Sequence, residues 1–353
     1  MRQAFPLIRI AALFLFPALL AYGAYTFMVG ALMRPADPNS TETVSVLVQP
    51  GMNFRGVCRQ LQEQGIVRYA RSLDLLARLR DKKTEKIIVG EYLLSASMTP
   101  ETILNKLVSG DIFKRKVLLR EGESYKVLPD RVAQSGLVTL EDINKTLADP
   151  QLLARAGISA SNFEGYLFPN TYEFSRPVEA HQIVWAMLEE GEKHWPPEFS
   201  DQADKLGMTR HEILTLASII EKETGIVEEQ PTISSVFHNR LKAGMKLQAD
   251  PTVIYGLVDF DGNLRKADLL DAHDYNTYVH FGLPPGPIAN PGESAIRAAL
   301  FPAETEYLFF VADGTGAHVF STTLGEHNAA VLKYQKKPQE TDPVDPVNPV
   351  EPS

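Results

Sequence analysis

The sequence predicts an α+β protein made of a transmembrane helix, a small α+β subdomain and a larger α+β domain. Residues 10–33 form an apolar run without charges, about as long as the ~20 residues needed to cross a bilayer. Strand and helix patterns are then mixed along residues 44–336. Residues 337–353 are acidic and rich in proline, which predicts an extended, mobile tail with no core of its own.

The apolar run predicts a single-pass membrane anchor. Arg2 and Arg9 precede it, so we expect residues 1–9 to stay in the cytoplasm and the bulk of the chain to lie outside the inner (cytoplasmic) membrane, on its periplasmic or extracytoplasmic side. Arg34 on the far side weakens this bias. The alternative is a cleaved signal peptide, but such peptides have a shorter apolar core. The length of the run therefore favours a retained anchor.

Residues 44–112 predict the small α+β subdomain, which follows a polar linker at residues 34–43. Cys58 has no partner for an intrachain disulfide and is expected to be a small buried helix residue. The predicted elements are strands at 44–50 and 89–95 and helices at 54–64, 72–80 and 100–107, the last capped by Thr99. A strand, a helix pair and a closing strand resemble a LysM-like, glycan-binding module. The alternative is a spacer domain without a ligand of its own.

Residues 113–336 predict the larger domain, in which residues 113–160 bridge the two folded parts. The loop at residues 275–292 is long for a compact domain, and its aromatic residues favour a functional loop over a disordered one. The stretch at residues 199–210 is polar, and residues 247–256 combine an Asp-Pro turn with a short apolar run. The predicted elements are a strand at 113–124, helices at 125–134, 211–224, 232–245, 293–300 and 324–336, and a β-hairpin at 306–323.

Residues 163–174 are dense in aromatic side chains, with glycine, proline and asparagine between them, so neither a clean helix nor a clean strand is expected. Such a segment can cover a hydrophobic core. Aromatic faces beside Asn and Glu side chains are also what a sugar-binding cleft uses to stack rings and bind hydroxyl groups. The residues alone leave both interpretations open.

The predicted helix 211–224 places an acid at the edge of its apolar side. At 100° per residue, Ile213, Ala217 and Ile220 form a narrow stripe, and Glu221 lies beside it. An apolar surrounding disfavours the charged carboxylate and raises its pKa, as a general acid requires. Glu223 flanks the same stripe from the other side. Two solvated glutamates at a helix end would show the same pattern, so the geometry does not decide between them.

Six motifs in one order resemble the MltG-type (YceG-like) endolytic murein transglycosylases. They are EGYLFPNTY, LASIIEKET, VFHNRL, LQADPTVIYG, YNTYVHFGLPPGPIANPG and YLFFVADGTGAHVFSTTLGEHN, and they cover nearly all of residues 164–328. The resemblance implies a lyase that cuts nascent peptidoglycan strands between N-acetylmuramic acid and N-acetylglucosamine. Such a lyase would leave 1,6-anhydro-muramyl ends and would terminate strand elongation. The resemblance also implies that Glu221, the first acid of the EKE run, is the catalytic residue, although the family commonly has SIVEKE where this chain has SIIEKE.

Further candidates come from the loops that carry the motifs. Aromatic and hydrogen-bonding side chains of residues 163–174, 247–256 and 275–292 are candidates for substrate binding. They are Glu164, Tyr166, Asn170, Gln248, Asp250, Thr252, Tyr275, Asn276, Thr277 and Tyr278. For each of these, a turn cap or a packed aromatic ring is the alternative. We expect Gln248, Asp250 and Thr252 to be exposed in a turn, and Glu223 to be a modulator or a bystander.

No metal or other cofactor is expected, because the histidines lack ligand spacing and no phosphate-binding glycine loop follows a strand. The net charge of −9 argues against nucleic acid as a partner. The expected partners are peptidoglycan strands, the membrane and, from topology and family, peptidoglycan synthases. The alternative function is a non-enzymatic scaffold that binds peptidoglycan at the membrane, which would not need the placement of Glu221.

Overall fold

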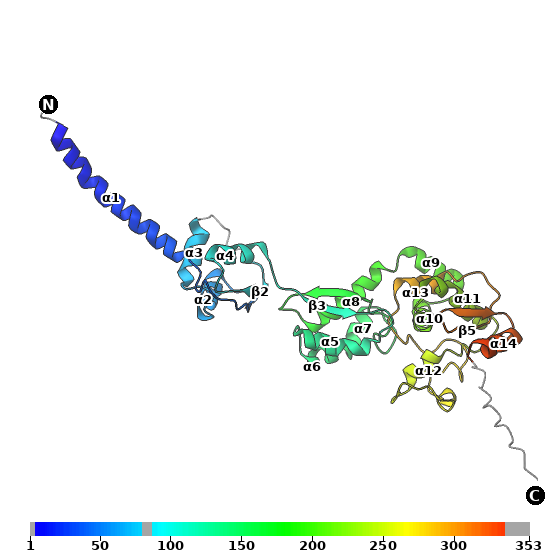
Figure 1. The fold of residues 1–353 in the computed structure, drawn as a ribbon. Coiled ribbons are helices and arrows are strands. Elements are labelled where there is room, and N and C mark those ends of the chain that lie inside the picture. Colours follow the sequence, from blue (N-terminus) through cyan, green and yellow to red (C-terminus); the bar gives the residue numbers. More distant parts are fainter. Residues whose placement is uncertain (1–3, 80–86, 336–353) are drawn as a thin grey trace, which may run out of the picture. The chain divides into compact units, whose positions relative to one another are not determined.

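The structure is a computed structural model that describes residues 4–79 and 87–335 (Figure 1). It combines helices with short strands, as the predicted α+β class requires. The chain divides into two compact units. The first unit comprises Met1–Val117, Gln134–Val138 and Glu173–Glu179, and the second comprises Leu118–Ala133, Thr139–Tyr172 and Ala180–Ser353. The predicted tail at residues 337–353 lies outside the described residues.

The chain begins with helix α1 (Ala4–Leu32), which contains the apolar window Leu15–Leu32. By length and composition this helix can cross a membrane, as the apolar run predicts. Directly after it, Met33 packs against the hydrophobic core of the first unit. The following linker is also held in place, since Asp37 N donates to Ala96 O and Arg68 Nη2 donates to Ala36 O.

The first unit is a two-stranded antiparallel sheet with two helices inserted between its strands. Strand β1 (Val44–Val48) pairs with β2 (Gly90–Leu94), and Val46 lies opposite Tyr92. The helices α2 (Phe54–Glu63) and α3 (Ala70–Leu79) lie between them in sequence, and α4 (Pro100–Ser109) follows. These five predicted elements are confirmed. Residue 80, the last residue of the helix predicted at 72–80, lies outside the described residues. Cys58 is buried in α2, as expected.

A cluster around Glu91 in β2 connects two later segments to the first unit. Arg176 binds Glu91 directly, and Arg115, which also binds Glu91, donates to Ser135 O at 2.7 Å. The Glu91 side chain is fully buried and binds Ser45, Arg115 and Arg176. Burial acts to raise the pKa of Glu91, but the hydrogen bonds from the two guanidinium groups outweigh this and hold it well below its usual range. Sequence periodicity does not indicate this cluster, because its members lie far apart in the chain.

The second unit is mainly helical. Its strands are short: β3 (Arg115–Leu119) and β4 (Asn170–Phe174) cross the unit boundary and pair with each other, and β5 (Phe309–Ala312) forms an antiparallel hairpin with β6 (His318–Ser321). The helices are α5 (Leu128–Ser135), α6 (Leu140–Leu147), α7 (Pro150–Arg155), α8 (Ala180–Lys193), α9 (Pro197–Leu206), α10 (Arg210–Glu223), α11 (Gln230–Lys242), α12 (Asp250–Gly256), α13 (Glu293–Leu300) and α14 (Leu324–Tyr334).

Several predicted boundaries were wrong. The strand predicted at 113–124 ends at Leu119, and residues 120–124 form a turn. The polar stretch 199–210 lies mostly in α9, and the Asp-Pro turn at 247–256 is the start of α12. Both helices have proline in the first turn, where its fixed φ suits a helix and its missing N–H is not needed. Residues 163–174 do contain a strand, β4.

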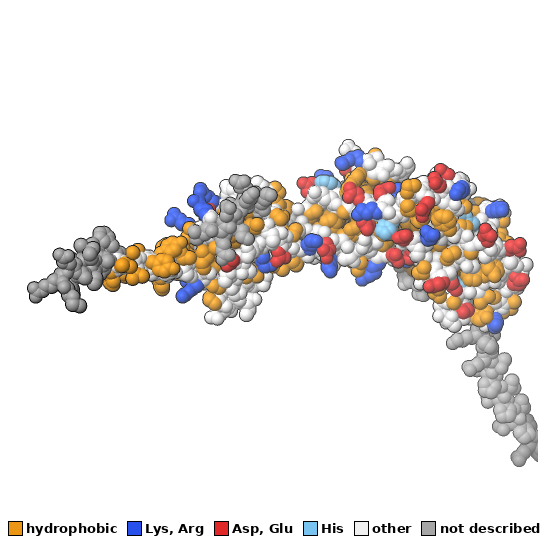
Figure 2. All heavy atoms as spheres, turned by 90° about the horizontal axis from the view of Figure 1, so that it is seen from above, with side chains coloured by type: hydrophobic (Ala, Val, Ile, Leu, Met, Phe, Trp, Pro, Cys, Tyr) orange, Lys and Arg blue, Asp and Glu red, His pale blue; other side chains and the backbone are white. Residues whose placement is uncertain are grey.

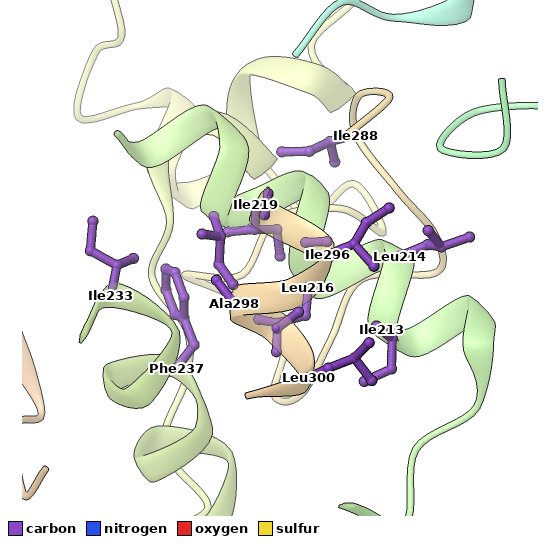
Figure 3. Packing of buried hydrophobic residues seen from close by; sticks show 14 of the residues in the cluster. Ile213, Leu214, Leu216, Ile219, Ile233, Phe237, Ile288, Ile296, Ala298 and Leu300 are labelled. Atoms are coloured by element: carbon purple, nitrogen blue, oxygen red, sulfur yellow. The ribbon is translucent and has the colours of Figure 1, made fainter. Parts of the chain in front are cut away.

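The core of the second unit surrounds α10 (Figure 3). Every residue from Ile213 to Ile220 is buried, so this helix is enclosed on all sides rather than amphipathic as expected. Helices α13 and α11 pack against it. The hydroxyl groups of Thr215 and Ser218 donate to backbone carbonyls within the helix, which satisfies them inside the core. A rigid, fully packed helix therefore carries Glu221 at its end.

Candidate active site

Glu221 lies in the last turn of α10, where the helix leaves the core. Its side chain is half-buried, and its Oε2 accepts a hydrogen bond from the backbone N–H of Gly292 at 3.1 Å. Gly292 is the N-cap residue of α13, so the positive end of that helix is directed toward the carboxylate. Two helices from distant parts of the sequence thus define the position of the acid.

A turn at residues 121–123 covers another side of Glu221. The amide of Gly122 donates to Asn290 O at 2.9 Å, and the amide of Asn290 donates to Glu123 O at 2.9 Å. Lys222 Nζ donates to Gly122 O at 3.3 Å and links the turn to α10. A Cβ atom on Gly122 would lie 3.5 Å from Glu221 Cγ, which shows how closely the turn approaches the acid.

A second carboxylate, that of Glu121, lies near the Glu221 side chain. The side chain of Glu121 lies against Gly292, because a Cβ atom added there would be 2.2 Å from Glu121 Oε1. Glu121 is exposed, whereas Glu221 is half-buried. Glu121 and Glu221 therefore meet at the same glycine, one from the solvent side and one from the helix.

The surroundings of Glu221 favour its protonated form. Burial raises the pKa of the Glu221 carboxyl, and the negative charge of Glu121 raises it further. The Gly292 N–H and the ammonium of Lys222 act in the opposite direction. The net shift is upward, so the side chain can hold a proton closer to neutral pH and still has a donor for its ionised form.

Asn290 holds the segments around Glu221 together. Its side chain is fully buried, and Oδ1 accepts from the amides of Gly165 (3.0 Å) and Leu167 (3.2 Å). Its Nδ2 donates to Glu123 O at 2.9 Å. One side chain therefore connects the loop before α13, the turn beside Glu221 and the aromatic segment.

The candidates of the aromatic segment separate in space. Glu164 is 1 % exposed and accepts from Ser124 Oγ, the Tyr125 amide and Tyr255 Oη. Burial raises its pKa despite these bonds. The Tyr166 hydroxyl bonds to His211 Nδ1 at 2.7 Å, near the first residue of α10 and about 15 Å along the helix from Glu221. Asn170 is exposed on β4 and donates to Glu190. Their roles in substrate binding stay predictions.

A cavity of about 470 Å³ collects other candidates on a different side of α10. Its lining includes Glu223, Gln248, Asp250 and Tyr278, and the Tyr278 hydroxyl donates to Asp250 Oδ1. Glu221 is not among the lining residues. The two acids of the EKE run thus face separate surroundings, as a spacing of two residues on a helix dictates.

Thr252, Asn276 and Thr277 are buried and hold the loop at residues 275–292 in place. The hydroxyl groups of Thr252 and Thr277 lie 2.8 Å apart, and Asn276 Nδ2 donates to Asp271 O at 2.6 Å. The expectation that Thr252 is exposed in a turn was wrong, because the residue lies inside α12. The neighbouring Tyr275 is half-buried, with its ring 4.8 Å from that of Tyr255.

Glu223 should make the stability of the second unit depend on pH. Burial, reinforced by Asp250 and opposed by Arg240, raises the pKa of Glu223 from 4.5 to about 8. Between these values the folded state keeps a proton that the unfolded state has lost. Unfolding free energy should therefore fall as pH rises through this window, by at most about 1.4 kcal/mol per pH unit.

The Glu223→Gln variant should lose this dependence and be more stable than the wild type at pH 8. Urea unfolding of the full-length protein in detergent, followed by tryptophan fluorescence, measures it, because Trp185 and Trp195 both lie in the second unit. The exposed Glu228→Gln serves as the matched control. Equal slopes for all three proteins between pH 5 and 8 would contradict the assignment.

Sequence reasoning missed Glu121, Asn290 and Gly292 as parts of this site. Asn290 and Gly292 lie inside the PIANPG motif, and Glu121 precedes a glycine directly after β3. A Glu-Gly or Asn-Pro-Gly step is an ordinary turn signal. Nothing in such a signal says which turns meet at one carboxylate.

Comparison with known proteins shows the family of the chain. The sequence matches the model of the YceG-like family over residues 46–333, and the chain belongs to this family. An endolytic murein transglycosylase of Bacillus subtilis (strain 168) is 31 % identical over 325 residues, which are 87 % of this chain and 89 % of the relative. An endolytic murein transglycosylase of Streptococcus pneumoniae serotype 2 is 29 % identical over 330 residues, and the matched part spans 59 % of its length.

A solved structure is similar as well. The crystal structure of a YceG-like protein from Listeria monocytogenes superposes with a TM-score of 0.57 at 32 % sequence identity. The match covers 82 % of this chain and 99 % of that one. The resemblance indicated by the six motifs is thereby confirmed.

Proposed function

We propose that this protein is an endolytic murein transglycosylase, a lyase that cuts the glycan strands of peptidoglycan, with Glu221 as its catalytic acid. The observation that carries the function is the similarity to a relative of that name over 87 % of the chain. The half-buried Glu221, held by Gly292 and covered by the turn at residues 121–123, supports the choice of the acid.

One acid is sufficient for this reaction. Protonated Glu221 gives its proton to the oxygen that joins N-acetylmuramic acid to N-acetylglucosamine, and the bond between that oxygen and the anomeric carbon breaks. Ionised Glu221 then accepts the proton of the 6-hydroxyl of the same muramic acid, whose oxygen attacks the anomeric carbon. Because the nucleophile belongs to the substrate, no water is consumed and little entropy is lost. Hydrolases instead need a second carboxylate as nucleophile or base.

The groups around Glu221 suit both halves of this cycle. Burial and the charge of Glu121 favour the protonated acid at the start. The Gly292 N–H and the positive end of α13 stabilise the carboxylate that forms after the first proton transfer. We expect the carboxylate of Glu121, which lies against the same glycine, to stabilise positive charge on the sugar ring.

The anchor places the reaction at the membrane. Helix α1 would hold the protein in the inner membrane, with residues 1–9 in the cytoplasm and the chain from residue 34 onward on the outer side. There it would cut nascent strands and terminate their elongation beside a peptidoglycan synthase. Residues 44–112 would form a LysM-like, glycan-binding subdomain, a role supported by the order β1–α2–α3–β2. Residues 113–336 would form the catalytic domain.

Mass spectrometry of the products tests the reaction. Purified peptidoglycan is incubated with the full-length protein in detergent, and the muramyl ends are identified. We expect ends that are lighter than reducing ends by one water, the mark of the 1,6-anhydro ring. Reducing ends would mean hydrolysis and would overturn the proposal. Binding of the strands without any new ends would favour the non-enzymatic scaffold.

A further inference from the structure

The first unit contains a cavity that the proposed reaction does not use. It has a volume of about 840 Å³ and lies between α2, α3 and the end of α1. Its lining consists of Leu32, Arg55, Cys58, Arg59, Ala70, Arg71, Asp74, Leu75 and Arg78. Figure 2 shows Lys and Arg side chains gathered where the apolar helix meets this unit. Four guanidinium groups and one carboxylate therefore face one hollow.

The sequence places these arginines by helical spacing. Arg55 and Arg59 are four residues apart on α2, and Arg71 and Arg78 are seven apart on α3, so each pair lies on one face. The opposite faces carry buried residues, such as Leu61 and Leu73, that pack into the core of the unit. Because α2 packs against α3, both basic faces border the same cavity.

Within the described ranges 4–79 and 87–335, one of the four guanidinium groups has a carboxylate partner. Asp74 forms an ion pair with Arg78 at 3.0 Å. Among the residues that the structure describes, Arg55, Arg59 and Arg71 have no carboxylate within ion-pair distance, and all three are exposed. Like charges around one hollow repel each other, so an anion bound between them is stabilised. Guanidinium groups are well suited to phosphate, because they donate two parallel hydrogen bonds.

The rest of the lining points to an anion with an apolar part. Leu32, Cys58, Ala70 and Leu75 supply apolar surface to the cavity. Leu32 is also the last residue of the apolar window of α1, and Met33 after it packs into the core of the unit. Because Met33 packs into the core and the linker after it is hydrogen-bonded to the unit, the cavity lies at the membrane surface if α1 spans the bilayer. Juxtamembrane arginines are attracted to anionic lipids.

We propose that this cavity binds the phosphate headgroup of a membrane lipid, with Arg55, Arg59 and Arg71 as its ligands. Arg78 is paired with Asp74 and is not counted as a ligand. The apolar lining contacts the glycerol or the first carbons of the lipid. Binding would give the first unit a second attachment to the bilayer besides α1.

Lipid binding to the full-length protein in detergent tests the proposal, with native mass spectrometry as the readout. Phosphatidylglycerol and phosphatidylcholine are titrated as anionic and neutral probes, and a polyprenyl diphosphate distinguishes a diphosphate lipid from a phospholipid as the source. We expect phosphatidylglycerol, the polyprenyl diphosphate or both to bind more tightly than phosphatidylcholine. In Arg55→Gln/Arg59→Gln the affinity for the anionic lipid should fall about tenfold to thirtyfold. Both side chains are exposed, so folding should be preserved.

The matched control is Lys145→Gln/Lys205→Gln, which removes the same charge from exposed positions of the second unit. Its affinity should equal that of the wild type. Arg55→Lys/Arg59→Lys should restore part of the lost affinity, because it restores charge without the paired donors. Equal binding of anionic and neutral lipids, or equal losses in the Gln variant and the control, would overturn the proposal. The assay contains no glycan, so such a result would leave the proposed reaction untouched.

Discussion

A Glu221→Gln variant should form anhydro-muramyl products about 10²–10⁴-fold more slowly than the wild type. The amide has nearly the same shape as the carboxylic acid, but it cannot give a proton to the glycosidic oxygen or take one from the 6-hydroxyl. Its oxygen can still accept the Gly292 N–H, so the contact between α10 and α13 is kept. Product formation from purified peptidoglycan, counted by mass spectrometry over time, measures the loss.

The variant should fold normally. Because its surroundings raise the pKa of Glu221, a neutral amide there should not reduce stability, and the melting temperature should stay within about 2 °C of the wild type. Glu228→Gln removes an exposed acid a few residues further along and should retain full activity. A Glu221→Gln protein that cuts within about tenfold of the wild-type rate would show that another group is the acid.

Regular elements of the fold were largely predictable. The helix predicted at residues 211–224 is α10 (Arg210–Glu223), and the hairpin predicted at 306–323 contains β5 and β6. Periodic apolar residues identify such segments because each buries one face. Helix α8 (Ala180–Lys193) went unpredicted, and α9 was taken for a polar stretch. The α9 sequence buries few residues, among them Phe199 and Ala203, so its periodic signal is weak.

The candidate site was less predictable than the fold. The pattern on α10 left Glu221 and Glu223 equivalent, and the family resemblance distinguished them. The structure adds that Glu221 meets Gly292 and the turn at Gly122, whereas Glu223 faces a separate cavity. The contacts of Glu221 reach segments that lie about 70 to 100 residues away in the chain, and they have no periodicity. A sequence pattern reports on the local chain, so it cannot show which loops converge on one side chain.

Asn290 gives the strongest test of that convergence. Replacing Asn290 by Ala removes the acceptor of two buried amides, Gly165 and Leu167, and the donor to Glu123 O. Buried amides without partners cost about 1–3 kcal/mol each, so the second unit should lose about 3 kcal/mol or more of unfolding free energy. Activity should also fall at least about tenfold, because the segments that carry Gly122 and Gly292 are no longer held beside Glu221. Tryptophan-detected urea unfolding and the product assay measure the two effects.

Two further variants separate the parts of this effect. Asn328→Ala changes an exposed asparagine on α14 and should alter neither stability nor activity. Asn290→Asp keeps the acceptor for Gly165 and Leu167 but loses the donor to Glu123 O and places a charge beside Glu164. If the two amide bonds dominate, Asn290→Asp should be more stable than Asn290→Ala. Because its new charge is buried beside Glu164, it should also be more stable at low pH, where the acid is protonated, than at neutral pH. An Asn290→Ala protein that unfolds within about 1 kcal/mol of the wild type would mean that the loops are held by their backbone contacts alone, and Glu221 would then owe its position to α10 and α13 without this side chain.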